Sequence, residues 1–276
     1  MYQTISKTIL GTATALAFVA SAAVAEDWRA WNIHTDGHPN TAAMDRFAEL
    51  VAEKTGGEVT VEVFHGGVLG SQPDALEQVQ LGAIDAGNFN LGPIGPIVKE
   101  ANLVSLPFIF RSVDHMFRVM DGPAGDQVSA AMGGNGTPMA FSEVYSSLST
   151  GVVDGAENNL PSFQSVGHFE VAGFYSLSEH LIIPECICVN TAKFNALSAD
   201  MQAAVVAAAE EASIYQRELW AEQTQASREA VEAAGVQINE IADKGPFQDA
   251  MAPVYADYLA ANPSMVELVE LAQSTE

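Results

Sequence analysis

A sixteen-residue pattern occurs twice in this chain, and it is the feature that most narrows the folds open to it. The stretch VQLGAIDAGNFNLGPI is followed sixty-nine residues later by LSTGVVDGAENNLPSF. Aligned on Gly82 and Gly151, the copies share an Asp, an Asn and a Leu. Each copy is typical of a helix that ends at a glycine, then a strand, then a polar segment. Because ligands bind at the carboxyl ends of strands in open α/β sheets, two copies predict two lobes that face a shared cleft. Chance recurrence of a common helix-to-strand junction is the alternative.

The first third of the chain alternates between the two periodicities of secondary structure. Apolar residues recur at helical spacing over residues 40–57 and 71–82, and with period two over 58–64. Asn40 is the predicted N-cap of the first helix, and Ser71 with Asp74 has the spacing of a capping box in the second. Short strands are predicted over 28–35 and 83–89. This β-α-β-α-β order favours a mainly parallel sheet.

The second half repeats the alternation on a larger scale. A helix is predicted over 138–151, a strand over 152–158 and an apolar strand over 182–190. From the N-cap Ser198 no helix breaker occurs until Gly235, which predicts a helix of about 36 residues and roughly 54 Å. Such a helix is better explained by packing across two lobes than by a coiled coil.

The first 25 residues have the form of a secretory signal peptide. Lys7 supplies a positive charge, residues 9–20 are apolar, and Ala23-Val24-Ala25 has the small residues of a cleavage site. The apolar run is shorter than the about 20 residues that a membrane span needs. We expect cleavage after Ala25, export of the mature chain to the periplasm, and no stable membrane insertion of that chain.

Composition excludes several classes of partner and site. The formal net charge of −24 would repel nucleic acid, so no nucleic-acid partner is expected. The two cysteines, Cys186 and Cys188, lie on one face of a predicted strand at a spacing unfavourable for a bridge. We therefore favour two small core side chains over a redox pair. Apolar residues make up 48% of the chain, enough for a large core without disulfides.

The sequence contains none of the short motifs that mark a catalytic or metal site. There is no G-x-S-x-G, H-E-x-x-H or C-x-x-C. His34 and His38 are four residues apart, but Asp36-Gly37 between them breaks the helix that metal binding at this spacing requires. We expect no enzyme activity, no metal and no cofactor.

Five blocks of the sequence, in this order, resemble the solute-binding subunits of TRAP transporters, which are periplasmic receptors of the dicarboxylate-receptor type. These are DGHPNTAAMDRFAELVAEKTGGEVTVEVFHGGVLG, ALEQVQLGAID, LVSLPFIFRSVDH, SEVYSSLSTGVVDGAENN and YQRELW. The resemblance implies an α/β, two-lobed (type II-like) binding protein with a long C-terminal bracing helix. It assigns residues 1–25 to the signal peptide, 26–131 mainly to lobe 1, 132–190 mainly to lobe 2 and 191–276 to the segment that packs across both.

The resemblance also implies that an internal segment is missing. Roughly fifty residues that the family has between DGPAGDQVSAA and MGGNGTPMAF are absent, and they carry an arginine that pairs with the ligand carboxylate. The chain has six arginines, none of them in that motif: Arg29, Arg46, Arg111, Arg118, Arg217 and Arg228. A charge-assisted pair of this kind contributes about 2–5 kcal/mol to binding, so its loss would weaken affinity by orders of magnitude.

Candidate ligand-binding residues follow from the resemblance and from the repeat. Asn158 is the first candidate, as a donor to a ligand carboxylate or hydroxyl, although it could instead cap the turn in which it lies. Asn90 corresponds to this region in the first copy, and His38 opens a helix whose amides could hold an anion. The full predicted set is Asn158, Asn90, Glu157, Asn159, His38, Gln72 and Tyr145.

The function that these features favour is capture of a small organic acid, either a dicarboxylate or a sugar acid, and its delivery to a TRAP permease in the membrane. Two alternatives remain. The chain could be a binding-defective remnant of such a receptor, because the arginine-bearing segment is missing. It could also be a ligand-sensing domain for a membrane kinase, since transport and sensing both need only a closing cleft.

Overall fold

The computed structural model describes residues 25–95, 97–122, 141–153 and 155–276. Its larger sheet contains β1 (Glu26–Trp31), β2 (Val59–Phe64), β3 (Ala86–Asn90) and β5 (Glu185–Val189) in the order β2-β1-β3-β5. β1 is parallel to β2 and β3, whereas β5 is antiparallel to β3. The mainly parallel sheet predicted from the alternating pattern is confirmed.

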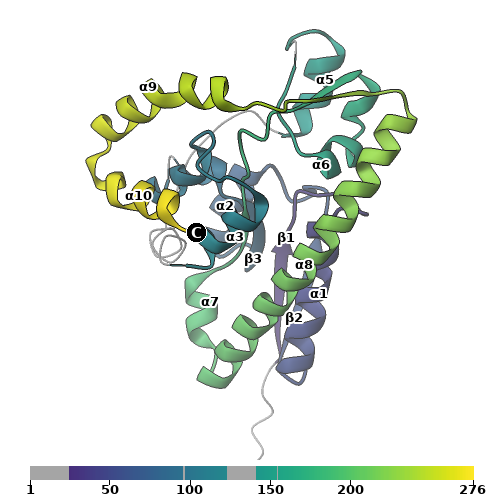
Figure 1. Cartoon of the computed structure of the whole chain (residues 1–276). Coiled ribbons are helices and arrows are strands. Elements are labelled where there is room, and N and C mark those ends of the chain that lie inside the picture. The colour runs from purple at the N-terminus through teal and green to yellow at the C-terminus, as the bar shows by residue number, and fades with distance from the viewer. Residues whose placement is uncertain (1–24, 96, 123–140, 154) are drawn as a thin grey trace, which may run out of the picture.

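Helices cover both faces of this sheet (Figure 1). Side chains alternate along β1, so Trp28 packs in a cluster with α1 (Pro39–Lys54) and α8 (Ala199–Ala233), while Trp31 packs on the opposite face. The Trp31 cluster includes residues of α2 (Gln72–Leu81), α3 (Val113–Met120) and α10 (Val266–Ser274). The sheet and its two helical layers form lobe 1.

The first helix begins two residues earlier than the sequence predicted. His38, not Asn40, is the N-cap, and its Nδ1 accepts a hydrogen bond from the Asn40 amide at 3.2 Å. The reason is Pro39, whose fixed φ and missing N–H suit the first helical position, so the residue before it becomes the cap. The Asn40 side chain is thereby left to contact α8.

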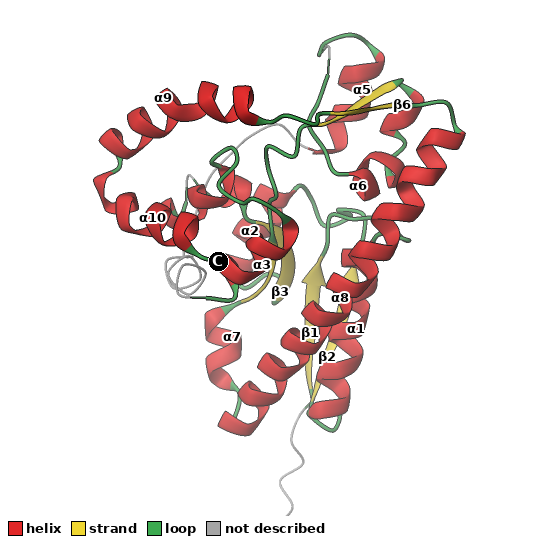
Figure 2. Ribbon diagram, viewed as in Figure 1, coloured by secondary structure: helices red, strands yellow, loops and turns green. Residues whose placement is uncertain are grey.

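The second lobe is smaller (Figure 2). It contains the parallel strands β4 (Phe174–Leu177) and β6 (Gln237–Glu240) and the short helices α5 (Val144–Ser149) and α6 (Leu160–Ser165). Its buried apolar cluster consists of Leu160, Phe163, Val231 and Val236. We refer to this region as lobe 2.

The two copies of the repeat diverge after their glycines. Gly82 and Gly151 both have left-handed backbones, with φ of 72° and 70°. The first copy continues into β3, but residues 152–153 and 155–159 form no strand, so the strand predicted over 152–158 is wrong. A strand needs a neighbour to satisfy its backbone groups. β3 lies between β1 and β5, and the second copy has no such neighbour in the described part of lobe 2.

The long helix α8 spans both lobes, as predicted (Figure 1). It has 35 residues, and the Ser198 side chain accepts a hydrogen bond from the Met201 amide at its start. It packs on α1 in lobe 1 and on α6 in lobe 2. Beyond it the chain returns to lobe 1 through α9 (Gly245–Ala261) and α10. Among the described residues, the remaining helices are α7 (Thr191–Ala196) and the 3₁₀ turns Gly92–Ile94, Lys99–Ser105, Phe141–Glu143, His168–Glu170 and Pro263–Met265.

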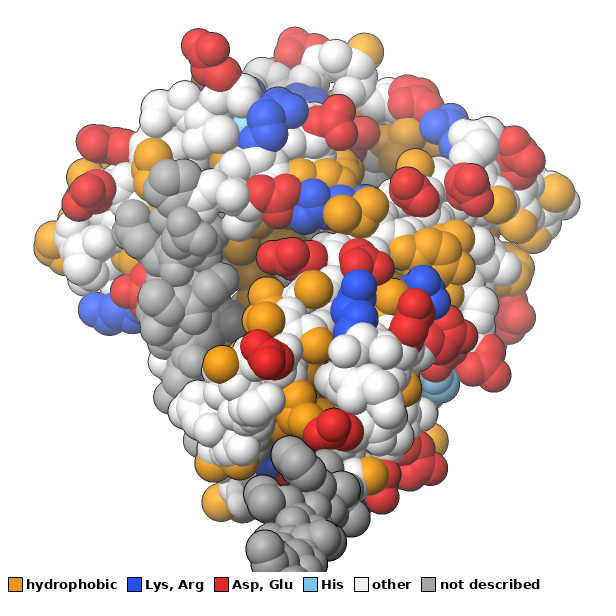
Figure 3. Space-filling model, turned by 90° about the horizontal axis from the view of Figure 1, so that it is seen from below, with side chains coloured by type: hydrophobic (Ala, Val, Ile, Leu, Met, Phe, Trp, Pro, Cys, Tyr) orange, Lys and Arg blue, Asp and Glu red, His pale blue; other side chains and the backbone are white. Residues whose placement is uncertain are grey.

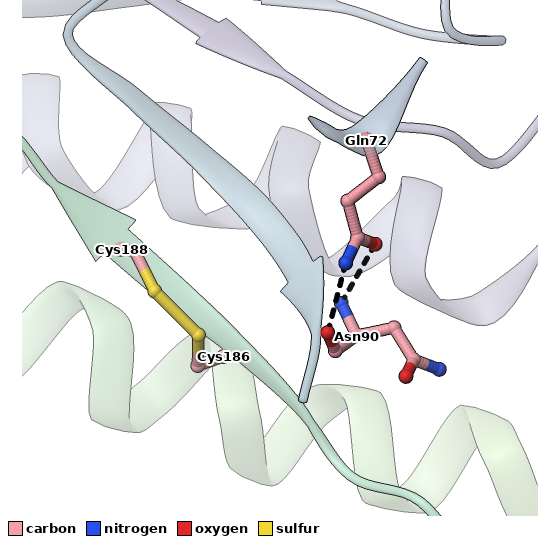
Figure 4. Close-up of a disulfide and its surroundings, with 4 residues drawn as sticks. All are labelled: Gln72, Asn90, Cys186 and Cys188. Atoms are coloured by element: carbon pink, nitrogen blue, oxygen red, sulfur yellow. Dashed lines mark hydrogen bonds between the residues drawn. A yellow bond between two sulfur atoms is a disulfide. The ribbon is translucent and has the colours of Figure 1, made fainter. Parts of the chain in front are cut away.

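Cys186 and Cys188 are bonded to each other on β5, contrary to the sequence prediction (Figure 4). Their Cα atoms are 5.8 Å apart, within the range of about 4.4–6.8 Å that a disulfide accepts. Because alternate side chains of a strand point to the same face, both sulfurs lie on one side of β5. The two residues are partly buried against the core of lobe 1.

The described residues have an acidic surface, and their helices are not of the kind that spans a membrane. Acidic side chains are spread over the face seen in Figure 3, with few basic ones between them. Within the described ranges, every helix is too short or too polar to traverse a lipid bilayer. The predicted signal-peptide core, residues 9–20, lies outside these ranges.

Candidate ligand-binding cleft

A cavity of about 2180 Å³ lies between the lobes. Its walls come from the carboxyl end of β3 and the start of α2 in lobe 1, from residues 157–163 in lobe 2, and from one face of α8. Pockets for small ligands usually measure about 300–1,000 Å³. A small acid would therefore contact both lobes only if the cleft narrowed.

In the lobe 1 wall, Gln72 holds the backbone of Asn90. Its side-chain Nε2 donates to the Asn90 carbonyl at 2.9 Å, and its Oε1 accepts from the Asn90 amide at 3.1 Å (Figure 4). The Asn90 side chain accepts from the Gly92 amide at 3.0 Å and lines the cleft. The two hydrogen bonds fix the end of β3, and with it the direction in which Asn90 leaves the strand.

In the lobe 2 wall, two consecutive asparagines stabilise the loop before α6. Asn158 Oδ1 accepts from the Asn159 amide at 2.9 Å, and Asn159 Oδ1 caps α6 by accepting from the Ser162 amide at 2.8 Å. Asn158 Nδ2 lies 3.4 Å from His168 Nδ1. The Tyr175 hydroxyl donates to the Asn158 carbonyl. Asn158 thus has a structural role in its turn, and it also faces the cleft.

A pair of stacked histidines lies at the base of the cleft. The rings of His34 and His38 are parallel within 5°, with centroids 3.8 Å apart. Burial, and secondarily the neighbouring His34, lowers the pKa of His38 to about 2. His38 is therefore neutral at physiological pH. His34 Nε2 lies 2.7 Å from Glu185 Oε1, at the start of β5.

The histidine pair connects lobe 1 to lobe 2 and to α8. Because His38 Nδ1 accepts from the Asn40 amide, its Nε2 carries the proton and donates to Ser162 Oγ in α6 at 3.3 Å. The Asn40 side chain accepts from Gln216 Nε2 of α8 at 2.7 Å. The ring of Trp220, one turn further along α8, packs at a steep angle against the His38 ring, with centroids 5.8 Å apart. These contacts hold the floor of the cleft together.

Two buried oxygen atoms on the cleft wall have no hydrogen-bond partner among the described residues. They are Asn88 Oδ1, on β3, and Glu185 Oε2, on β5. Both residues line the cleft. Buried acceptors without a partner are rare in proteins. Each of the two oxygens could accept a hydrogen bond from a donor that reached it.

Five of the seven residues predicted from the sequence lie together on the cleft wall. His38 lies behind that wall, stacked on His34, which does line it. Tyr145 is not among the described lining residues, and its hydroxyl donates to Glu170 Oε2 at 3.0 Å, which raises the Tyr145 pKa. The five that line the cleft are Asn158, Asn90, Glu157, Asn159 and Gln72. Their roles in binding stay predictions.

Other cleft residues were missed by the sequence analysis. Glu185 stands in an apolar stretch that predicted only a strand. On α8, the lining residues include Ser213, Gln216, Arg217, Trp220 and Thr224, which share one face of the helix. Polar side chains at helical spacing within a long helix were a signal for this face. Only the fold decides which other segments of the chain lie opposite this face of α8.

A second crevice, of about 270 Å³, lies between α1, β5, α7 and α8. Apart from Thr191 its lining side chains are hydrocarbon, among them Phe47, Phe194 and Val205. It offers little that could recognise a charged or polar solute. Within the described ranges there is also no group of three or more His, Cys, Asp or Glu side chains placed to hold a metal ion.

Comparison with known proteins agrees with this architecture. Bacterial extracellular solute-binding protein, family 7, matches residues 32–132 and 117–262. A solute-binding protein of Chromohalobacter salexigens is 44% identical, over 91% of this chain and 90% of its own. A crystal structure of a TRAP periplasmic solute-binding protein from Roseobacter denitrificans, with bound β-D-glucuronate, is 56% identical with a TM-score of 0.86 and covers 91% of this chain and all of its own. One from a Sulfitobacter species, with bound β-D-galacturonate, is 45% identical with a TM-score of 0.85, over 90% and 99% of the two chains.

The alignment with the Chromohalobacter protein is longer than the part of this chain that it covers. It spans 302 positions but covers 91% of 276 residues, about 251, so roughly 50 of its positions lie opposite no residue of this chain. This agrees with the gap of about fifty residues inferred from motif order. The order of the motifs, the two lobes and the long helix across them are all retained. The chain belongs to the bacterial extracellular solute-binding proteins of family 7, the TRAP periplasmic receptors, in a form shortened within the chain.

Proposed function

We propose that this protein captures a hexuronic acid, such as glucuronate or galacturonate, in the cleft between its lobes and delivers it to a TRAP permease. The similar proteins with bound β-D-glucuronate and β-D-galacturonate support this ligand class. The observation that carries the proposal in this chain is the pair of buried acceptors on the cleft wall, Asn88 Oδ1 and Glu185 Oε2.

These acceptors favour a sugar acid over a simple dicarboxylate. Sugar hydroxyls donate hydrogen bonds, and a hydroxyl that meets a buried acceptor removes the desolvation penalty of about 1–3 kcal/mol that the unpaired group carries. A carboxylate has no proton to donate at neutral pH. Placed against Glu185, a second carboxylate of the ligand would be repelled. The polyol part of a hexuronate suits this wall.

The proposed mechanism is closure of the lobes around the ligand. The loop of Asn158 and the strand end of Asn90 face the cleft from opposite lobes, so one ligand can contact both only when the lobes approach. We propose that Asn158, Asn159 and Glu157 contact the ligand from lobe 2, and Asn90 and Gln72 from lobe 1. His38 supports the floor rather than the ligand, and Tyr145 braces lobe 2 through Glu170.

Location and partners follow the same family expectation. We propose that cleavage after Ala25 releases the mature chain into the periplasm, where its closed form meets the membrane subunits of a TRAP permease. Residues 26–131 would form most of lobe 1 and 132–190 most of lobe 2, although β5 pairs within the lobe 1 sheet. We propose no catalytic step, because the role of the family is to bind and carry its ligand.

A binding experiment tests the ligand class. The mature chain would be titrated with D-glucuronate, D-galacturonate, succinate and D-glucose, with thermal shift and calorimetry as readouts. A ligand at 100 times its dissociation constant stabilises by about 2.7 kcal/mol, which shifts the melting temperature of a chain this size by about 5–10 °C. We expect shifts with the uronates that exceed those with succinate and glucose. No shift with any acid, from a folded sample, would identify the chain as a binding-defective remnant.

A variant locates the site. Asn158→Ala should remove the uronate shift. Asn239→Ala is the matched control, because Asn239 is an exposed residue of lobe 2 on β6 that does not line the cleft in the described structure. Equal shifts in both variants would show that the ligand binds elsewhere.

A further inference from the structure

Arg217 projects from the face of α8 that lines the cleft, one residue after Gln216 and three before Trp220. Of the arginines in the described ranges, only Arg111 also lines this cleft. The Arg111 guanidinium donates to the carbonyl oxygens of Gln273 and Thr275 near the C-terminus, so its hydrogen bonds belong to the backbone. Of these two arginines, Arg217 is the one whose guanidinium binds a side-chain carboxylate.

That carboxylate belongs to Asp121, at the C-terminal end of α3. Arg217 Nη1 and Nη2 donate to the two Asp121 oxygens, each at 2.7 Å, in the parallel two-bond geometry typical of arginine and carboxylate. The guanidinium also lies 4.1 Å from the centre of the Phe117 ring. Asp121 itself lines the cleft and its side chain is 54% exposed, against 30% for Arg217. Arg217 is thus fixed by Asp121 and by the Phe117 ring, and Asp121 is the more exposed member of the pair.

Arg217 also has a buried donor that Asp121 does not reach. Its Nε is buried without a hydrogen-bond partner among the described residues. The planar guanidinium presents five donors in a fixed arrangement, and Asp121 accepts from two nitrogens at one edge. A carboxylate that approached from the cleft could bond to the same edge of the guanidinium that Asp121 occupies.

We propose that Arg217 binds the carboxylate of the ligand and that Asp121 occupies this position as an internal competitor when no ligand is present. The inference rests on the proposed function, because it supplies the cation that a uronate requires. A ligand carboxylate offers the same two oxygens as Asp121, so it replaces the aspartate bond for bond. The apparent affinity is then the intrinsic affinity multiplied by the fraction of molecules in which Arg217 is free of Asp121.

The competition has a second component. Asp121 stays beside the cleft when the ligand displaces it, and its negative charge opposes that of the ligand. Asp121→Asn keeps the shape of the side chain, removes its charge, and weakens the competition because only one neutral oxygen remains to accept from Arg217. Asp121 is the C-cap of α3, where a negative charge is unfavourable with respect to the helix dipole. The variant is therefore not expected to weaken α3.

Four proteins test the proposal: the wild type, Asp121→Asn, Arg217→Gln and the double variant. Arg228→Gln is the matched control, because Arg228 lies on the same helix and pairs with Glu232 and Glu240, and none of the three lines the cleft in the described structure. Each protein is titrated calorimetrically with D-glucuronate and with its neutral amide, D-glucuronamide. Circular dichroism checks the fold, and Arg217→Lys replaces Arg217→Gln if the latter does not fold.

We expect Asp121→Asn to tighten D-glucuronate binding by about two- to fivefold, the range that corresponds to loss of a partly exposed competing pair. D-glucuronamide should bind the wild type and Asp121→Asn equally. Arg217→Gln should weaken D-glucuronate binding at least about tenfold, remove the effect of Asp121→Asn in the double variant, and differ from the unchanged Arg228→Gln. The proposal would also be supported if Asp121→Asn bound D-glucuronate and the wild type showed no detectable binding.

Other results overturn it. Unchanged or weaker D-glucuronate binding by Asp121→Asn, or equal tightening of both ligands, would show that Asp121 does not compete with a carboxylate. Wild-type affinity in Arg217→Gln would refute the arginine site while leaving the proposed uronate receptor intact. If neither the wild type nor Asp121→Asn binds any uronate, the proposed function itself fails.

Discussion

His34 and Glu185 stand 151 positions apart in the chain, and their side chains meet with 2.7 Å between Nε2 and Oε1. The contact joins the segment after β1 to the first residue of β5, next to the cleft. Since Glu185 Oε1 is engaged by His34, the carboxylate is oriented and Oε2 is left as a buried acceptor. The contact between His34 and Glu185 thus links two distant segments and also orients Glu185 Oε2, the atom proposed to accept a hydrogen bond from a ligand hydroxyl.

Replacing Glu185 should therefore affect both stability and binding. Glu185→Ala leaves the buried His34 without this partner, so the free energy of unfolding should fall by about 1–3 kcal/mol. Loss of the Oε2 acceptor should also weaken uronate binding about tenfold, equivalent to about 1.4 kcal/mol. Urea denaturation and calorimetry measure the two effects. The control, Glu211→Ala, breaks an exposed pair with Lys54 and should change stability by less than about 1 kcal/mol. Similar losses in the two variants would contradict the role given to Glu185.

The two hydrogen bonds between the Gln72 side chain and the Asn90 backbone, which we call the clamp, should stabilise the folded chain. Gln72→Ala removes both hydrogen bonds to the Asn90 backbone, and we expect a loss of about 1–3 kcal/mol in unfolding free energy. Gln80→Ala, an exposed site on the same helix, controls for the change in helix propensity. Chemical denaturation compares the two. A loss in Gln80→Ala as large as that in Gln72→Ala would show that the clamp contributes nothing.

The buried His38 predicts a stability that decreases in acid. Its pKa is lowered from 6.5 to about 2 in the folded protein. Between these values the unfolded chain binds a proton that the folded chain does not, so the free energy of unfolding falls as the pH falls, by about 1.4 kcal/mol per pH unit. His38→Asn keeps a good N-cap but does not titrate. The loss between pH 7 and pH 5 should be smaller in this variant by about 2 kcal/mol. Equal losses in the two proteins, measured by urea denaturation, would contradict this assignment.

The two lobes should differ in local stability. The buried cluster of lobe 2 consists of Leu160, Phe163, Val231 and Val236, and Phe174 on β4 is 75% exposed. Regions with few buried apolar contacts open more readily. In hydrogen-exchange mass spectrometry we expect β4, β6 and α6 to exchange before β1 and β3, and we expect a uronate to slow exchange most in lobe 2. Uniform exchange across the two lobes would be inconsistent with this prediction.

The bond between Cys186 and Cys188 should contribute only modestly to stability. It closes a loop of three residues, for which the chain-entropy model gives about 1.6 kcal/mol. Reduction should lower the melting temperature by about 3–6 °C, and Cys186→Ser with Cys188→Ser should melt like the reduced protein. Thiol titration under denaturing conditions counts the free sulfhydryl groups. Two free thiols in the untreated periplasmic protein would refute the bond.

Much of the fold could be predicted from local signals. The capping box of Ser71 and Asp74, the N-cap Ser198 and the left-handed glycines at 82 and 151 lie where the sequence predicted them. These features depend on interactions within a few residues, which sequence spacing records directly. The N-cap of α1 was misplaced by two positions, because the effect of Pro39 on the start of a helix outweighed the preference of Asn40 for a cap.

The sequence by itself predicted the helices α1, α2 and α8, the strands of lobe 1, and the polar residues that follow β3. The tertiary structure decided which of these residues meet. Arg217 and Asp121 are 96 positions apart, and no local pattern pairs them. Residues 152–158 have the composition of a strand, but residues 152–153 and 155–158 form none, because a strand requires a neighbour that only the assembled lobe can supply. Local propensity acts within one turn or one strand, whereas a cleft consists of contacts between distant segments.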